Sequence, residues 1–128
     1  MDPAALDLLK VNQQLLEAIA KGDWDTYAKL CDPSITAFEG EARGQLVEGM
    51  PFHRFYFDLD GQGGPTNTTM CAPHVRIMGD VGVVCCVRLV QFLDADRNPG
   101  TRRSEETRVW QRQNGQWRHV HVHRSSTT

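Results

Sequence analysis

The sequence predicts an α+β domain in which a curved antiparallel sheet wraps a long N-terminal helix. Two observations carry this prediction. Apolar residues recur at helical spacing through most of the first sixty positions, and from Thr66 onward the apolar period changes to two, as in strands. The order is therefore helices first, followed by a meander of long strands.

Two helices are expected at the start of the chain. Asp2 precedes a proline, which is typical of an N-cap followed by a first-turn proline. Gly22 is expected to end this first helix. Asp23 can cap a second, shorter helix that ends near residues 32–33. Together they predict a helical hairpin.

The next part of the chain mixes signals. Residues 34–39 are β-rich, and residues 43–58 return to helical spacing, with Pro51 expected to break that helix into two pieces. Residues 60–65 have the composition of a loop.

Four strands are expected in the second half, and the Asn114-Gly115 pair is a strong hairpin signal between the last two. Their predicted ranges are 68–78, bent at Pro73, then 82–93, 102–113 and 116–124, followed by a polar tail.

Length and composition suit a single domain over residues 1–128, with a core over about 4–125. A whole protein kinase does not fit in 128 residues. The formal net charge is −2, but it is unevenly distributed: residues 1–96 have a net charge of −7 and residues 97–128 a net charge of +5. All basic residues in the second segment are arginines. These arginines are spread singly through predicted strands, so we expect a folded sheet and no nucleic-acid partner.

The four cysteines form no C-x-x-C pair, and adjacent Cys85 and Cys86 point to opposite faces of a strand. Buried free thiols in a reducing compartment are expected, and the localisation is predicted to be cytoplasmic. Residues 1–21 are too charged for a signal peptide, and no membrane partner is predicted.

Strand parity places one arginine on the same partly apolar face of three neighbouring strands: Arg88, Arg108 and Arg124. Each guanidinium needs a counter-charge, because burying it unpaired is costly. One alternative is an anion pocket that accepts a carboxylate through the planar guanidinium fork. The other is internal pairing with the carboxylates of Glu39, Glu41, Glu105 or Glu106.

The last strand carries an H-x-H-x-H run, formed by His119, His121 and His123. Period two predicts all three on one face with Trp117, opposite the face of Arg124. No cysteine or carboxylate shares this short strand, so we predict a polar sheet face and no metal site.

Four aromatic residues surround His53 in residues 50–58. Phe52, Phe55 and Tyr56 are expected to anchor a helix over the sheet. Motifs for a nucleotide, a phosphate loop, a nucleophile elbow or a zinc protease do not occur, so no cofactor and no catalytic residue are predicted. His53 is the one candidate that we keep as a proton acceptor for an enzyme alternative.

Several blocks together resemble a known family over roughly residues 6–126. They are Cys31-Asp32-Pro33, Thr36-Ala37-Phe38-Glu39, Leu46-Val47-Glu48-Gly49, Phe52-His53-Arg54-Phe55-Tyr56-Phe57, Ser104-Glu105-Glu106-Thr107-Arg108-Val109-Trp110, Gly115-Gln116-Trp117 and His121-Val122-His123-Arg124-Ser125. The sequence resembles the association (hub) domain of calcium/calmodulin-dependent protein kinase II, within the nuclear transport factor 2-like superfamily.

This resemblance implies a cone-like fold with the N-terminal helix cradled by a strongly curved sheet. It implies a non-catalytic scaffold that associates with itself into closed double rings of dihedral symmetry and gathers kinase domains by multivalency. Calmodulin binding would belong to the parent kinase.

The resemblance also implies a cavity lined by Arg88, Arg108 and Arg124, with His53 beside it. Glu39 and Glu106 are the candidate ion-pair partners in this pocket. The expected ligands are small carboxylates and peptides from the kinase domain or its linker.

Two departures from the family pattern matter. The loop over residues 58–63 lacks the tryptophan that the family tends to carry, so gating of the pocket by that residue is not expected. Residues 81–83 are more apolar than in the family, which is expected to change edge packing and ring size. An isomerase or dehydratase that uses His53 and the arginine cavity remains the alternative function.

Overall fold

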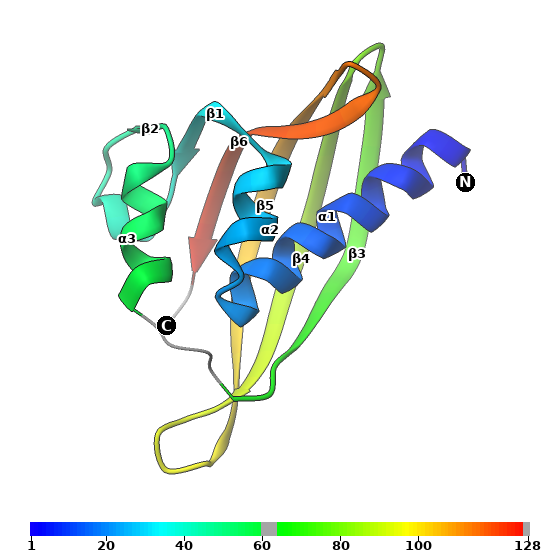
Figure 1. Cartoon of the computed structure of the whole chain (residues 1–128). Coiled ribbons are helices and arrows are strands. Elements are labelled where there is room, and N and C mark those ends of the chain that lie inside the picture. Colours follow the sequence, from blue (N-terminus) through cyan, green and yellow to red (C-terminus); the bar gives the residue numbers. More distant parts are fainter. Residues whose placement is uncertain (60–63, 127–128) are drawn as a thin grey trace.

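A computed structural model describes residues 1–59 and 64–126 of the chain. The elements in chain order are α1 (Pro3–Lys21), α2 (Trp24–Leu30), β1 (Cys31–Phe38), the 3-10 helix η1 (Gly40–Ala42), β2 (Val47–Glu48), α3 (Pro51–Leu59), β3 (Asn67–Met78), β4 (Val81–Leu93), β5 (Pro99–Gln113) and β6 (Gln116–Ser126). The strands form one sheet in the order β2-β1-β6-β5-β4-β3, and α1 and α2 cross one face of it (Figure 1). This face is called the inner face below. The predicted α+β class, with a curved sheet around the N-terminal helix, is confirmed.

The sheet is antiparallel from β3 to β6, as expected, but β1 joins it differently. β1 pairs with β6 in parallel, with Ala37 opposite Val122, while β2 is antiparallel to β1. The short β-rich segment predicted at 34–39 therefore extends the meander past its last strand.

The three helix caps predicted at the start of the chain are confirmed. The Asp2 side chain accepts a hydrogen bond from the Ala4 backbone N–H, and Gly22 ends α1 with a positive φ of 71°. The Asp23 carboxylate accepts from the Thr26 backbone N–H and begins α2.

No described helix combines the length and apolar character needed to cross a bilayer.

The main core joins α1 to the inner face of the sheet. Leu8 and Leu15 of α1, Val84 of β4 and Trp110 of β5 are all buried in it. Asn12 lies in the same apolar stripe, and its Oδ1 accepts a hydrogen bond from Trp110 Nε1 at 3.0 Å. This bond satisfies a buried indole N–H that the core would otherwise leave unpaired.

Gly82 sits where α1 crosses β4. A Cβ placed there would overlap Leu8 Cδ2, so glycine allows the close approach of helix and strand. β4 lies between β3 and β5 and not at a sheet edge, so the expectation that residues 81–83 alter edge packing is wrong.

The helix expected over residues 43–58 begins only at Pro51. Arg43, Gly44 and Gly49 all have positive φ, which no helix tolerates, and the intervening residues supply the short strand β2. The predicted anchors also differ. Phe55 is 59% exposed and Tyr56 is 39% exposed, so neither anchors α3.

The packed aromatic residues of α3 are Phe52 and Phe57, each against a buried core cluster. Of the predicted loop and tail, residues 60–63 and 127–128 lie outside the described residues. This includes most of the loop in which the family tends to carry a tryptophan.

The strand irregularities follow the sequence signals. The β3–β4 register shifts between Cys71 and His74, where Ala72 has a φ of 48°, so the bend predicted at Pro73 is confirmed. Asn114 and Gly115 both have positive φ, as the two-residue hairpin turn requires.

Candidate functional site

A cavity of about 840 Å³ lies on the inner face of the sheet, between β4, β5 and β6 on one side and the ends of α1 and α3 on the other. Its lining includes all four predicted pocket residues: His53, Arg88, Arg108 and Arg124. The arginines come from three adjacent strands, and Arg124 on β6 is directly opposite Glu106 on β5. Strand parity and strand order together bring them to one place.

Glu106 joins two of these arginines. Its carboxylate lies 2.9 Å from Arg108 Nε and 2.8 Å from Arg88 Nε, and it accepts a hydrogen bond from the Ser104 hydroxyl at 2.7 Å. Burial alone would raise the pKa of Glu106, but Arg108 and Arg88 outweigh burial and lower it to about 2. Glu106 is therefore an ionised counter-charge inside the fold.

Arg88 is less completely satisfied than Arg108. Its Nε–H is close to Glu106 but finds no hydrogen bond of good geometry among the described residues. Burial lowers the pKa of Arg88 to about 10, and the nearby cations Arg108 and Arg124 act in the same direction. The site thus holds positive charge that its own carboxylates only partly compensate.

The second half of the site centres on Glu39. His53 Nε2 lies 2.7 Å from Glu39 Oε1, and Arg124 Nη2 lies 3.2 Å from Glu39 Oε2 and 2.6 Å from Glu41 Oε1. Burial would raise the pKa of Glu39, but the hydrogen bond and charge of His53 and the charge of Arg124 lower it. The carboxylates of Glu39 and Glu41 also outweigh burial and raise the pKa of Arg124.

His53 keeps one ring nitrogen unused. His53 is only 8% exposed, and its buried Nδ1 has no hydrogen-bond partner among the described residues. A buried polar atom without a partner in a cavity wall is unusual.

Each inward arginine has a carboxylate partner, although the pairing at Arg88 lacks a hydrogen bond of good geometry. Of the predicted partners, Glu39, Glu41 and Glu106 make these contacts. Glu105 pairs with Arg103 at 3.3 Å, and both side chains are largely exposed. The lining as a whole is nevertheless cationic. Its described residues include six cationic side chains, Lys21, Arg88, Arg102, Arg103, Arg108 and Arg124, but only the two carboxylates Glu39 and Glu41.

The histidine run does not lie on one face, and this prediction is wrong. The β5–β6 register pairs Trp110 with His119 and Val109 with His121, so Val120 is an extra residue in β6. Such a bulge inverts the alternation. His119 and Trp117 consequently point inward on the face of Arg124, while His123 is exposed.

His119 is a site residue that sequence reasoning missed. It is fully buried, with Nε2 3.4 Å from Arg108 Nη1 and Nδ1 3.7 Å from Cys31 Sγ. Burial, and then the charge of Arg108, hold the pKa of His119 well below its usual value. The sequence held one signal for the bulge. Trp117 and Arg124 are seven positions apart, so strict period two cannot place both side chains on the inner face.

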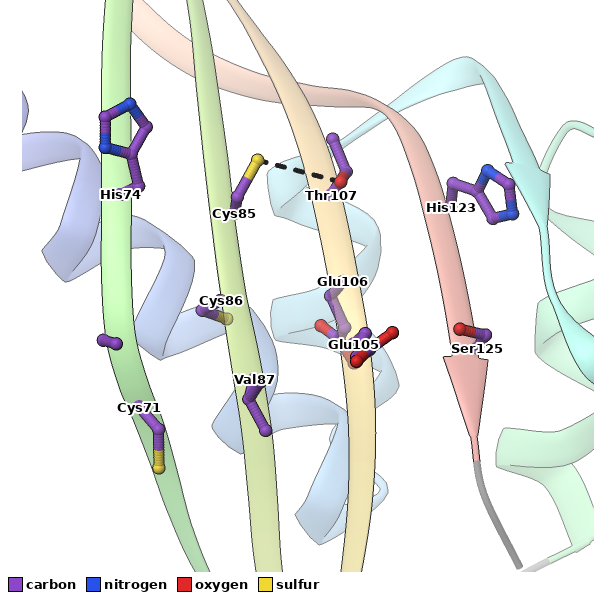
Figure 2. Close-up of a pocket in the computed structure, with 11 residues that line it drawn as sticks. Cys71, His74, Cys85, Cys86, Val87, Glu105, Glu106, Thr107, His123 and Ser125 are labelled. Atoms are coloured by element: carbon purple, nitrogen blue, oxygen red, sulfur yellow. Dashed lines mark hydrogen bonds between the residues drawn. The ribbon is translucent and has the colours of Figure 1, made fainter.

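A shallower hollow of about 500 Å³ lies on the outer face of the sheet (Figure 2). His74, Cys85, Thr107 and His123 line it, with Cys85 Sγ 3.7 Å from Thr107 Oγ1. Its described lining contains carboxylates but no lysine or arginine, so it does not suit an anion. Within the described residues, no three His, Cys, Asp or Glu side chains gather as a metal site.

The comparisons with known proteins agree with this architecture. The family model described as the calcium/calmodulin dependent protein kinase II association domain matches residues 4–128. The delta subunit of calcium/calmodulin-dependent protein kinase type II from Oryctolagus cuniculus is 49% identical over 124 residues, which cover 94% of this chain and 23% of the rabbit protein. The chain therefore spans about a quarter of that relative's length.

Two solved structures are similar over nearly their whole length. The association domain of the Caenorhabditis elegans kinase is 50% identical with a TM-score of 0.87, covering 94% of this chain and 93% of that chain. The hub homology domain from Chlamydomonas reinhardtii is 47% identical with a TM-score of 0.89, covering 98% of this chain and 99% of that one.

More distant structures show the fold alone. A dehydratase-like protein of the nuclear transport factor 2-like family from Streptomyces avermitilis has a TM-score of 0.78 at 17% identity, covering 98% of this chain and 96% of that chain. The predicted superfamily fold is thereby confirmed, and by its matched family model and its relatives near 50% identity the chain belongs to the calcium/calmodulin-dependent protein kinase II association-domain family.

Proposed function

We propose that this chain is a non-catalytic hub that assembles into closed double rings of dihedral symmetry and holds attached kinase domains or their linker peptides close together. The observation that carries the proposal is the match of the association-domain model to residues 4–128. Relatives of this family associate with themselves, and self-association raises the local concentration of whatever is attached. Closed symmetry limits the assembly to a finite size.

Native mass spectrometry of the whole chain tests the assembly. Two stacked rings require an even number of subunits, so the spectrum should show large assemblies at even stoichiometries only. A monomer or a simple dimer at micromolar concentration would overturn the hub, and a single ring with an odd number of subunits would overturn the double ring.

We propose that residues 1–128 form one association domain with a core over about residues 4–125. We also propose that the chain acts in the cytoplasm. The four cysteines are free thiols, which suits a reducing compartment.

We further propose that the inner cavity binds a small carboxylate or an acidic peptide group. Two features support this: the cationic excess of the lining and the incompletely compensated charge at Arg88. Phe92 and Val90 add apolar surface to the same cavity, and Arg102 lies 4.3 Å above the Phe92 ring. The cavity therefore suits an anion that carries an apolar body.

Thermal unfolding with acetate, propionate or succinate tests the cavity. Binding to the folded state raises the melting temperature as ligand is added. We expect Arg108→Ala to abolish this rise and Arg102→Ala to weaken it. Arg112→Ala is the matched control, because Arg112 lies 4.3 Å above the Trp117 ring but does not line the cavity. No rise with any carboxylate would leave the arginines with a structural role only.

A second candidate function rests on the Glu39–His53 pair. The carboxylate orients Nε2 of the imidazole, and the buried Nδ1 is left to accept a proton, which is the arrangement of a general base. An isomerase or dehydratase acting on a carboxylate substrate would use it. Turnover of such substrates that disappears in His53→Ala would support this function, and its absence across a substrate panel would leave the hub alone.

A further inference from the structure

We infer that His119 is a positioning residue for the anion cavity: as a neutral hydrogen-bond acceptor, it fixes the Arg108 guanidinium so that Nη2 is the nitrogen offered to a ligand. This inference rests on the proposed carboxylate binding. It deepens that proposal by naming which atom of Arg108 takes part and what holds it there.

The chemistry of the contact determines the state of His119. A guanidinium only donates hydrogen bonds, so the Nε2 atom that lies 3.4 Å from Arg108 Nη1 must accept and cannot carry a proton. The single proton of the neutral ring is then on Nδ1, which faces the Cys31 sulfur at 3.7 Å. Burial raises the pKa of Cys31 to about 12, so that sulfur is a neutral thiol and a weak acceptor.

Two contacts then hold one planar group. Glu106 accepts from Arg108 Nε at 2.9 Å, and His119 accepts from Nη1 at 3.4 Å. Two fixed nitrogens define the plane of a guanidinium. The third, Nη2, has no side-chain hydrogen bond among the described residues, and Arg108 lines the cavity while being only 3% exposed.

The bulge explains how His119 reaches this place. Without the extra residue Val120, period two would put His119 on the outer face with His121 and leave Nη1 without its partner. Side chains re-aimed by bulges are common next to binding sites. Here the re-aimed side chain contacts an arginine that the anion proposal already requires.

Three substitutions separate hydrogen bonding from packing. His119→Gln carries an amide at the position of Nε2 and keeps an acceptor for Arg108. His119→Asn carries its amide at the position of Nδ1 and cannot reach Arg108, and His119→Leu removes the acceptor altogether. Ile35→Val is the stability control, because Ile35 is fully buried in the core but does not line the cavity.

The measurement is calorimetric titration of each assembled variant with propionate and succinate. We expect His119→Leu and His119→Asn to weaken binding about tenfold, the usual effect of losing one hydrogen bond to a charged group. His119→Gln should stay within about twofold of the parent chain, and Ile35→Val should bind normally. If His119→Leu does not fold, the comparison of Gln with Asn decides the matter.

The outcomes distinguish the two proposals. A parent chain that binds neither probe overturns the carboxylate function and this inference with it. A parent chain that binds, with the Asn and Leu variants binding equally well, overturns the positioning role and leaves the carboxylate function standing. Equal weakening in Gln, Asn and Ile35→Val would show an effect of packing and would also overturn the positioning role.

Discussion

Glu106 and Arg108 stand two residues apart on β5, and the Glu106 carboxylate accepts a hydrogen bond from Arg108 Nε at 2.9 Å. Both are buried on the inner face, where an unpaired charge would be costly. Glu106 also contacts Arg88 of the neighbouring strand, so one carboxylate serves two cations. This sharing leaves positive charge in the cavity while keeping the fold stable.

Replacing Glu106 by glutamine should strongly destabilise the chain. The amide keeps the volume but removes the negative charge, which leaves Arg88 and Arg108 facing each other uncompensated. We expect the free energy of unfolding to fall by about 3–5 kcal/mol. Urea unfolding at pH 7 and constant protein concentration measures it. Glu105→Gln is the matched control on the outer face, with an expected change within about 0.5 kcal/mol; equal losses at the two positions would refute the buried role.

The same carboxylate predicts a dependence of stability on pH. Its pKa is about 2 in the folded chain against an ordinary value of 4.5, so the folded state favours the ionised form. The stabilisation is fully present above pH 4.5 and is lost as the pH falls from there toward 2, for a total of about 3 kcal/mol. Unfolding measured between pH 6 and pH 2 should show this loss, and Glu106→Gln should show a correspondingly flatter profile.

The bond between Asn12 and Trp110 predicts a coupling between α1 and β5. Asn12→Leu should cost about 1–3 kcal/mol, because the buried indole N–H loses its acceptor. In Trp110→Phe that donor is already gone, so adding Asn12→Leu should cost much less. A double-mutant cycle of urea unfolding measures the coupling. Simple additivity of the two changes would contradict the role of this bond.

The sequence predicted the parts of the site that depend on strand parity. Arg88 and Arg108 lie on regular strands, so alternation alone placed both on the inner face. Arg124 was also placed correctly, because parity was counted from Val122, which follows the bulge. The face of His119 was wrong because it was counted across Val120, and no residue type at that position marks an extra residue in the ladder.

Local backbone conformation limited the rest of the prediction. The segment before Pro51 has helical apolar spacing, yet positive φ angles at Gly44 and Gly49 divide it into a turn and the strand β2. The exposure of Phe55 was equally hidden, because helical spacing does not tell which face of a short helix meets the sheet. Tertiary packing decides both.

The contact between α1 and β4 predicts the effect of a single methyl group. In Gly82→Ala the new Cβ would overlap Leu8 Cδ2, and Leu8 is fully buried and cannot move freely. We expect a net loss of about 1–2 kcal/mol, since overpacking outweighs the better strand propensity of alanine. Gly40→Ala is the control, with no atom within 4 Å of its added Cβ. A Gly82→Ala chain as stable in urea as the parent would show that α1 shifts at no cost.

The cysteines provide a test of the core that needs no substitution. Burial raises the pKa of Cys31 to about 12 and that of Cys86 to about 11, so neither thiolate forms near neutral pH in the folded chain. In contrast, Cys71 and Cys85 are only half-buried, so the prediction of buried thiols is wrong for these two. Iodoacetamide at pH 8 should therefore leave Cys31 and Cys86 unmodified until urea unfolds the chain, as read by peptide mass spectrometry. Rapid labelling of Cys31 under native conditions would contradict the burial of this thiol against His119.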